Sequence, residues 1–499
     1  MRTDPSHAET PIAFASSAVT PASTAPAEPA ISLPRLGPLG LRARLPRLTL
    51  RFGPRAARAA LAALVLATFA IVAYASAGPS VLVPRSTQTF PGWEAGPLHN
   101  LLGSYIENPN TLGLVFSGVL VAMVLAYVIV LASVRTLSMR TIAICVVALH
   151  VILLLSPPLQ LTDLFNYLGY GRLGALHDLN PYTHVIKQEF FDPVYRFTSW
   201  HNLKSPYGEL FTAITYPLAF VSLPVAYWTI KVITVLLSLG FVALVWHCAR
   251  QLGRDPRFAV VFVALNPIFL IYAVAGFHND FFMLAASMAA IAFLLARRDR
   301  LSGAALMVAI AVKFTAVVIL PFLLVAARTR RRRIQILVGG ALAAAPLIAM
   351  SLILYGFSIP NLSDQSSLLT DFSLPNLFGL LIGLGGGTPG LLRMATIAVV
   401  LVIAHQVHRR RDWLSGAGWS TFALIASLAW LVPWYVIWLL PLAALGTSVR
   451  LRRAALALTV FLVITFAPAT AQYFSQHNIN PLASSVGQAS TSRQNKLAQ

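Results

Sequence analysis

The stretch TLGLVFSGVLVAMVLAYVIVLAS, residues 111–133, decides the fold class of this chain. It contains no charged side chain, and about 20 apolar residues are enough for an α-helix to cross the hydrocarbon core of a bilayer. The same pattern recurs along the 499 residues, which are 57% hydrophobic and only 11% charged. Soluble globular domains have about 25% charged residues. The sequence therefore predicts an all-α polytopic membrane protein.

Further apolar segments of similar character extend over most of the chain. Some are too short to cross a bilayer alone, so together they predict a bundle of about 11–13 transmembrane or half-membrane helices. They are residues 59–77, 141–156, 224–248, 258–274, 281–296, 302–327, 334–355, 391–407, 419–432, 434–445 and 454–467.

Positive charge lies between the apolar segments and orients the chain. A net charge of +21 could indicate nucleic-acid binding in a soluble protein. Here the arginines gather in short loops, such as 250–257, 328–333 and 450–453. Short basic loops stay in the cytoplasm, so we expect a cytoplasmic N-terminus and no nucleic-acid partner. Cys145 and Cys248 both fall in apolar segments, which argues against a disulfide framework.

Composition divides the chain into three parts. Residues 1–57 are rich in Ala, Pro, Ser, Thr and Arg without hydrophobic periodicity, which predicts a disordered, basic cytoplasmic tail. Residues 58–470 contain the apolar segments and form the predicted membrane domain, with a long outer loop at 159–223. Residues 471–499 are polar, and we expect a disordered tail on the outer face.

One apolar segment, 302–327, leaves two topologies open, because arginines flank it on both sides. It is either a single span that violates the charge rule, or two short helices that meet near Lys313 and return to the cytoplasm. The second alternative keeps every later basic loop inside, and we prefer it. Irregular backbone at membrane depth must be buried in protein or line a wet cavity. We therefore expect Lys313 to lie at a functional site.

The longest polar interval between apolar segments is 161–210. Residues 162–176 can form an interfacial helix on which Asp163 and Tyr167 share a face. A carboxylate at a membrane mouth is partly desolvated and can act as a general base, although capping of the helix is the simpler alternative. Residues 189–204 are expected to form a mobile cover. The other candidate binding residues of the interval are Arg172, Asn180, Tyr182 and Tyr207.

Two more segments are predicted to lie on the same outer face. The sequence GFHND, residues 276–280, separates two apolar segments, and a solvated turn is the alternative interpretation. It contains no second His or Cys at a zinc-ligand spacing, so we expect no metal. Trp434 and Tyr435 follow Pro433 and predict either an interfacial aromatic belt or a surface for a sugar or prenyl chain. The polar side chains of the turn are His278, Asn279 and Asp280.

Six segments in order resemble the GT-C glycosyltransferases that use polyprenyl-phosphate sugars. The order and spacing are closest to the actinobacterial α-mannosyltransferases of lipomannan and phosphatidylinositol mannoside synthesis, and the resemblance covers about residues 140–470. The segments are TDLFNYLGYGRLG (162–174), NPYT (180–183), SPYG (205–208), GFHND (276–280), AVKFTAVVILPFLL (311–324) and VPWYVIWLLPLAAL (432–445).

The resemblance implies a membrane enzyme that transfers a hexose, with mannose preferred over glucose or arabinose. The donor would be a polyprenyl-phosphate sugar and the acceptor a lipid-linked glycan. Transfer would occur with inversion, on the outer face of a bacterial plasma membrane. It implies no cofactor or metal, and membrane lipid is the remaining partner.

The resemblance also assigns roles to residues. The general base of the family maps to Asp163, and the candidates for binding the donor phosphate are Lys313, Arg172 and His278. No second acid stands beside Asp163, which leaves Asp280 as the second carboxylate. A transporter or flippase of polyprenyl-linked sugars would use the same buried lysine. Transporters tend to contain internal repeats, and no copy of the polar interval occurs elsewhere, which favours the enzyme.

Overall fold

The computed structural model describes residues 52–78, 80–83, 90–99, 101, 108–160, 163–409 and 412–499. Nearly all of the tail predicted at 1–57 lies outside these residues. The described part of the chain is built from helices and turns and contains no strand. This confirms the all-α class.

The helices alternate between long apolar rods and short connecting pieces. The longer ones are α1 (Pro54–Ala77), α3 (Pro109–Ser133), α4 (Met139–Leu154), α5 (Asp163–His177), α7 (Leu223–Gln251), α9 (Asp280–Leu295), α10 (Asp299–Val312), α12 (Arg330–Tyr355), α15 (Pro389–Arg409), α16 (Trp413–Ser427), α18 (Val449–Thr465) and α20 (Ser485–Ala498). The shorter ones are α2 (Gly92–Ala95), α6 (Glu209–Thr215), α8 (Pro256–Ala264), α11 (Leu320–Ala326), α13 (Ser363–Ser366), α14 (Leu374–Leu381), α17 (Val436–Leu445) and α19 (Pro468–Gln476). Among the short π- and 3-10-helical pieces, η6 (Phe269–Val274), η7 (Phe314–Ile319) and η8 (Pro433–Tyr435) bear on the site.

Several helices are long and apolar enough to span a membrane. Within the described ranges there are five, namely α1, α3 with its extension to Thr136, α7, α12 and α15. Helices α18 and α19 make a sixth if the pair, bent by 53°, is one broken span. Shorter apolar helices such as α9 and α17 cannot cross alone and pack among their neighbours instead. These helices confirm a polytopic membrane protein.

The helices have two chemically different ends. Helix α9 begins at Asp280, and beyond its other end Asp299 pairs with Arg332 at 2.6 Å. Its 16 residues separate these two carboxylates by about 24 Å. Helix α17 also has a basic end. The Gly446 carbonyl, just after its last residue, accepts a hydrogen bond from Arg452. Arginines therefore lie at one end of these helices, where Asp299 pairs with one of them, and Asp280 lies at the other end.

The segment between α9 and α12 is a hairpin, which is the second of the two topologies predicted from the sequence. Helix α10 ends at Val312, and Lys313 is extended, with φ −153° and ψ 115°. The chain then returns through η7 and α11. At the basic end, Arg332 pairs with Asp299 at the start of α10, and Arg333 donates to the Leu324 carbonyl of α11 at 2.9 Å. The start of α10 and the end of α11 thus lie together at the basic end, and Lys313 lies at the tip of the hairpin between them.

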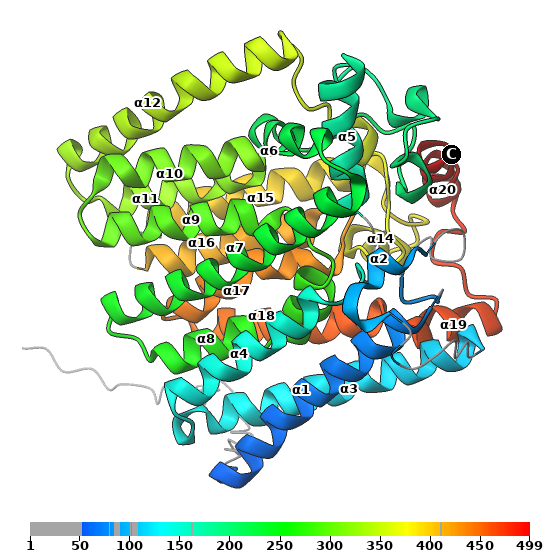
Figure 1. The fold of residues 1–499 in the computed structure, drawn as a ribbon. Coiled ribbons are helices and arrows are strands. Elements are labelled where there is room, and N and C mark those ends of the chain that lie inside the picture. Colours follow the sequence, from blue (N-terminus) through cyan, green and yellow to red (C-terminus); the bar gives the residue numbers. More distant parts are fainter. Residues whose placement is uncertain are drawn as a thin grey trace, which may run out of the picture. The chain divides into compact units, whose positions relative to one another are not determined.

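Glycines bring α10 close to α12. A Cβ atom on Gly303 would lie 1.8 Å from the carbonyl oxygen of Ile336, and one on Gly339 would lie 1.9 Å from that of Arg300. Small residues at such positions allow two helix backbones to approach closely. Helices α9, α10 and α12 therefore lie side by side (Figure 1), which fixes the position of the hairpin tip.

The C-terminal residues differ from the disordered tail predicted at 471–499. They form most of α19 and all of α20, drawn in red in Figure 1. The backbone N–H of Asn202 donates to the Leu497 carbonyl at 2.9 Å, and the N–H of Leu369 donates to Ser490 Oγ at 2.7 Å. A polar helix has no apolar stripe to reveal it in sequence, and its order here comes from the surface that it contacts.

Candidate active site

Two acid–base pairs lie together at the end of the helices opposite the arginines. Asp163, the first residue of α5, places its Oδ2 atom 3.4 Å from His278 Nδ1. Lys313 at the hairpin tip donates from Nζ to Asp280 Oδ1 at 2.8 Å. Trp438 Nε1 donates to the same oxygen. Four residues predicted from three separate sequence segments are thus brought together.

Asp163, Asp280 and Lys313 of these pairs line a small cavity of about 80 Å³, and His278 lies behind Asp163. The side chain of Asp163 is 18% exposed, whereas that of Asp280 is 1% exposed. Asp163 is therefore the carboxylate that a substrate can reach, while Asp280 is neutralised by the lysine. The predicted residues that line the cavity are Asp163, Tyr207, Asn279, Asp280, Lys313, Trp434 and Tyr435.

The turn that carries His278 has unusual backbone geometry. It follows η6, a π-helix, and π-helical turns are frequent at functional sites. Phe277 has φ of 51°, a left-handed conformation that costs a bulky residue about 1–3 kcal/mol. A Cβ atom on Gly276 would lie 2.5 Å from His278 Nε2, so this position requires glycine. The imidazole stacks on Trp434 with ring centroids 3.8 Å apart, which holds it beside Asp163.

Aromatic side chains form the wall of the site. The Tyr167 hydroxyl oxygen accepts from the backbone N–H of Asn279 at 3.2 Å, and its ring packs edge-on against Tyr207 at 4.8 Å. Burial raises the pKa of both Tyr167 and Tyr207 well above the usual value, and the Asp163 charge adds to this effect. Both phenols therefore stay protonated. Tyr435 lies beside Lys313, whose Nζ is 5.1 Å from its ring centroid.

Three buried polar atoms of the turn have no hydrogen-bond partner in the described part of the chain. They are His278 Nδ1, Asn279 Nδ2 and Asp280 Oδ2. Buried polar groups in proteins are almost always satisfied. His278 Nδ1 faces Asp163 Oδ2 at 3.4 Å, whereas Asn279 and Asp280 line the cavity. Asn279 Nδ2 and Asp280 Oδ2 therefore indicate a polar ligand.

Arg172 lies apart from this cluster. Its Nε donates to Asp192 at 2.9 Å and its Nη1 donates to the Ala219 carbonyl at 3.2 Å. His177 also binds Asp192, at 2.9 Å. Although burial opposes the effect, these hydrogen bonds lower the pKa of the Asp192 carboxyl. The guanidinium predicted to bind phosphate is thus committed to a carboxylate of its own loop.

Asn180 and Tyr182 also serve the fold rather than the cavity. Asn180 donates from its amide to the Tyr355 carbonyl at 2.8 Å and accepts from the backbone N–H of Tyr182. The hydroxyl of Tyr182 donates to Thr212 Oγ1 at 2.9 Å or to the Tyr207 carbonyl at 3.0 Å. The structure brings neither into the cavity.

The segment 189–204, expected to be a mobile cover, is fastened at several points. Asp192 carries the bonds from Arg172 and His177, and Asn166 accepts from the backbone N–H of Ser199 at 3.0 Å. The Tyr170 hydroxyl donates to the Leu203 carbonyl at 2.7 Å. These contacts hold the segment against α5.

Two protein families match the sequence. The family described as alpha-(1→6)-mannopyranosyltransferase, N-terminal domain, matches residues 61–329, more than half of the chain. The chain belongs to this family. Glycosyltransferase family 87 matches residues 206–465. The expected resemblance to the GT-C α-mannosyltransferases is confirmed, and the chain is a glycosyltransferase. The alternative of a transporter without transferase activity is set aside, because both families are transferases.

Curated relatives agree with this assignment. Alpha-(1→6)-mannopyranosyltransferase A of Mycobacterium tuberculosis is 29% identical over 359 residues, which cover 63% of this chain and 67% of the relative. Alpha-(1→6)-mannopyranosyltransferase B of Corynebacterium glutamicum is 24% identical over 349 residues, covering 58% of this chain and 56% of the relative. The matched parts thus span between half and two thirds of these relatives. No solved structure matches the chain.

The family matches include the acid–base cluster but not the C-terminal helix. Asp163, His278, Asp280 and Lys313 all lie within 61–329, whereas α20 lies outside both matched ranges.

Sequence reasoning missed several residues of the cavity wall. Trp200, Leu203, Gln365, Leu368 and Trp430 line it. Leu203 and Leu368 form a buried cluster with Leu497 of α20, against which the two tryptophans pack. These residues come from separate segments, so no local pattern marks them as neighbours. The only signal in the sequence was the presence of Trp200 and Trp430 in polar or proline-containing stretches. In the described residues, no three His, Cys, Asp or Glu side chains are grouped as a metal site.

Proposed function

We propose that this protein transfers mannose from a polyprenyl-phosphate donor to a lipid-linked glycan acceptor, with inversion at the anomeric carbon and Asp163 as the general base. The observation that carries the proposal is a base and a cation in the lining of one cavity. The partly exposed carboxylate of Asp163 and the Lys313 ammonium both line it. The relatives named alpha-(1→6)-mannopyranosyltransferase support mannose as the sugar.

In this mechanism Asp163 takes the proton of an acceptor hydroxyl as its oxygen attacks the anomeric carbon. The bond from that carbon to the phosphate oxygen breaks, and the polyprenyl phosphate leaves with the electron pair. His278, 3.4 Å from the carboxylate, holds Asp163 in place and stabilises its charge. A positioned base of this kind contributes about 10²–10⁴-fold to a rate.

Lys313 is placed to meet the charge that develops on the leaving phosphate. An ammonium group has three N–H donors, and only one is used on Asp280. The side chain is 22% exposed and lies near the rings of Tyr435 and Trp438, at 5.1 and 5.0 Å from their centroids. A phosphate oxygen in the cavity would take a second N–H. Such charge-assisted hydrogen bonds are about twice as strong as neutral ones.

We also propose that the site faces the outside of the plasma membrane. The guanidinium groups of Arg332 and Arg452 lie at the helix ends away from the site. Basic loops at helix ends are retained in the cytoplasm. A donor and acceptor that are both lipid-linked would then meet at the outer surface.

A transfer assay tests the proposal. Membranes containing the protein are incubated with radiolabelled polyprenyl-phosphate mannose and an octyl α-mannoside, and label in the acceptor is measured. The wild type should transfer label, and Asp163→Asn should not. The matched control is Asp178→Asn, an exposed acid just beyond the other end of α5, which should retain activity. Equal rates for Asp163→Asn and wild type would remove the base from the mechanism.

A further inference from the structure

The loop between α5 and α6 contains an exposed aromatic cluster, and its residues 187–196 are named the aromatic loop. Phe191 is 95% exposed and Phe190 is 60% exposed, and their rings pack edge-on with centroids 5.5 Å apart. Tyr195 packs on Phe190 at 4.8 Å. Clustered apolar side chains on a surface mark a contact with another protein or with a membrane. Neither phenylalanine lines the catalytic cavity, so the transfer reaction does not account for them.

One guanidinium group holds the aromatic loop beside the start of α7. Arg172 Nε donates to the Asp192 carboxylate at 2.9 Å, and its Nη1 donates to the Ala219 carbonyl at 3.2 Å. Asp192 directly follows Phe191 in the chain, and Ala219 lies just before α7. The exposed rings are therefore held at the same end of the protein as the start of this helix.

The start of α7 is the upper limit of an apolar surface. The helix is long and apolar enough to span a membrane, and its residues Val225, Val232 and Leu236 are exposed. Their spacings of seven and four residues place them on one face of the helix. Phe220 and Val221, just before the helix, are exposed as well. The surface that faces lipid thus continues from α7 to the level of the aromatic loop.

The charges of the aromatic loop also suit a membrane surface. Lys187 and Arg196, near its two ends, are exposed. Phospholipid phosphates attract basic side chains, and aromatic rings are enriched at the boundary between headgroups and acyl chains. The acids Glu189 and Asp192 both contact His177, so they are already bound within the protein. The outward-facing groups are therefore the rings and the two cations.

We propose that the aromatic loop docks into the membrane leaflet on the side of the active site, with its two phenylalanine rings among the acyl chains and its two basic side chains at the phosphates. The partner is the phospholipid bilayer itself. The loop continues to Trp200 and Leu203, which line the catalytic cavity. Docking therefore fixes one wall of that cavity near the depth of the lipid headgroups. This contact does not depend on the identity of the sugar or on the transfer step.

Spin labelling of the full-length protein in phosphatidylcholine–phosphatidylglycerol liposomes tests the proposal. A nitroxide is attached at Phe191→Cys, and because the ring is 95% exposed, its replacement removes little packing. Cys145 and Cys248 are buried, and the unmutated protein serves as the labelling blank. Oxygen is concentrated among acyl chains and a nickel chelate in water, so the two collision rates of the nitroxide report its surroundings.

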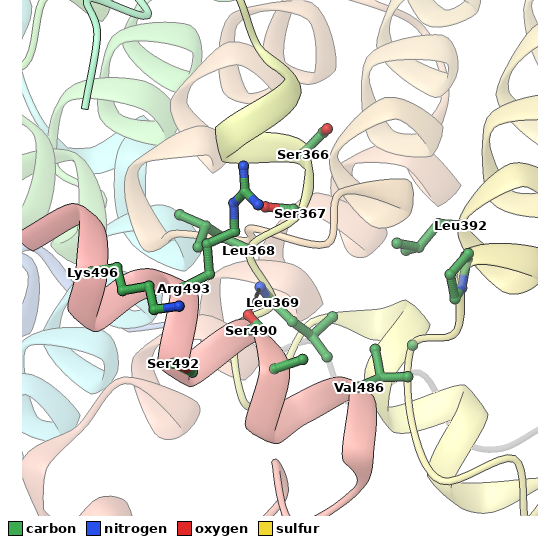
Figure 2. Close-up of a pocket in the computed structure, with 13 residues that line it drawn as sticks. Ser366, Ser367, Leu368, Leu369, Leu392, Val486, Ser490, Ser492, Arg493 and Lys496 are labelled. Carbon is green, nitrogen blue, oxygen red and sulfur yellow. Dashed lines mark hydrogen bonds between the residues drawn. The ribbon is translucent and has the colours of Figure 1, made fainter. Parts of the chain in front are cut away.

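Two exposed positions calibrate the measurement. Leu236→Cys lies on the lipid-facing side of α7 and represents the acyl chains. Ser492→Cys is the matched control in water. It lies on the polar helix α20, in a hollow between that helix and the segment 366–369 (Figure 2). All residues of α20 are described, and none is an exposed large hydrophobic residue.

The label at position 191 should collide with oxygen more often than with the nickel chelate, as at position 236, and the order should be reversed at position 492. A label at 191 that collides mainly with the nickel chelate would overturn the inference, because the loop would then lie in water. Low collision rates with both reagents would overturn it too, since they would indicate a protein partner such as a second copy of the chain. Phe190→Cys repeats the measurement at the neighbouring ring, so a folding defect in one variant does not decide the outcome.

Discussion

Replacing Lys313 with methionine should destabilise the protein, because it leaves a buried carboxylate without its ion pair. Asp280 is fully buried, and its Oδ1 atom accepts from Lys313 and from Trp438. Breaking a buried pair by removing one partner costs about 3–5 kcal/mol. Lys313 is 22% exposed and the Trp438 bond remains, so we expect the lower end, about 3 kcal/mol.

The companion variant is Asp280→Asn, alone and combined with Lys313→Met. The double variant removes the charge together with its partner, so its loss should be smaller than the sum of the single losses by about 2 kcal/mol. Unfolding of the purified protein in detergent by increasing denaturant gives all four free energies. Lys187→Met, at an exposed lysine, is the matched control and should change stability by less than about 0.5 kcal/mol.

Two results would refute this reasoning. If Lys313→Met unfolds like the wild type, the pair does not hold the hairpin tip. If the single losses simply add, the two residues do not interact. The double variant also separates stability from catalysis, because it should fold and yet lack the cation for the leaving phosphate. Full transfer activity in that variant would exclude Lys313 as the group that binds the leaving phosphate.

Three further predictions address other residues. Asp163→Asn should lower kcat by about 10²–10⁴-fold with the acceptor KM nearly unchanged, as measured by initial rates; a KM effect alone would mean a binding role. Arg172→Gln should leave transfer within about threefold but lower the unfolding free energy by about 3 kcal/mol, since Asp192 loses its guanidinium partner and keeps only His177 and the Val194 N–H; a selective loss of transfer would contradict this. Burial raises the pKa of Glu94 from 4.5 to about 8, against the opposing charge of Lys231. Its contribution to stability is therefore complete below pH 4.5 and is lost as the pH rises through about 8. The unfolding free energy should fall by up to about 1.4 kcal/mol per pH unit in that window, and Glu94→Gln should abolish the slope.

The sequence by itself determined the fold class, favoured the hairpin and named the residues at the centre of the proposed site. Hydropathy is a local property, so an uncharged run such as 111–133 predicts a helix regardless of its neighbours. The arginines on both sides of 302–327 favoured a hairpin with both ends on one face and Lys313 at its turn over a single span that violates the charge rule, and the structure contains the hairpin. The same alternation placed Asp163, His278 and Asp280 on one predicted face, while their roles came from the resemblance to the GT-C glycosyltransferases.

Only the tertiary structure decided which polar residues are available to a substrate. Arg172 and Lys313 are both cations in predicted functional segments, yet Arg172 is held by Asp192 and Lys313 faces the cavity. Asn180 is likewise used by the Tyr355 carbonyl, 175 residues away. The order of α20 depends in the same way on distant contacts. Whether a polar group binds a ligand or the protein is set by what reaches it from elsewhere in the chain, and local sequence does not carry that information.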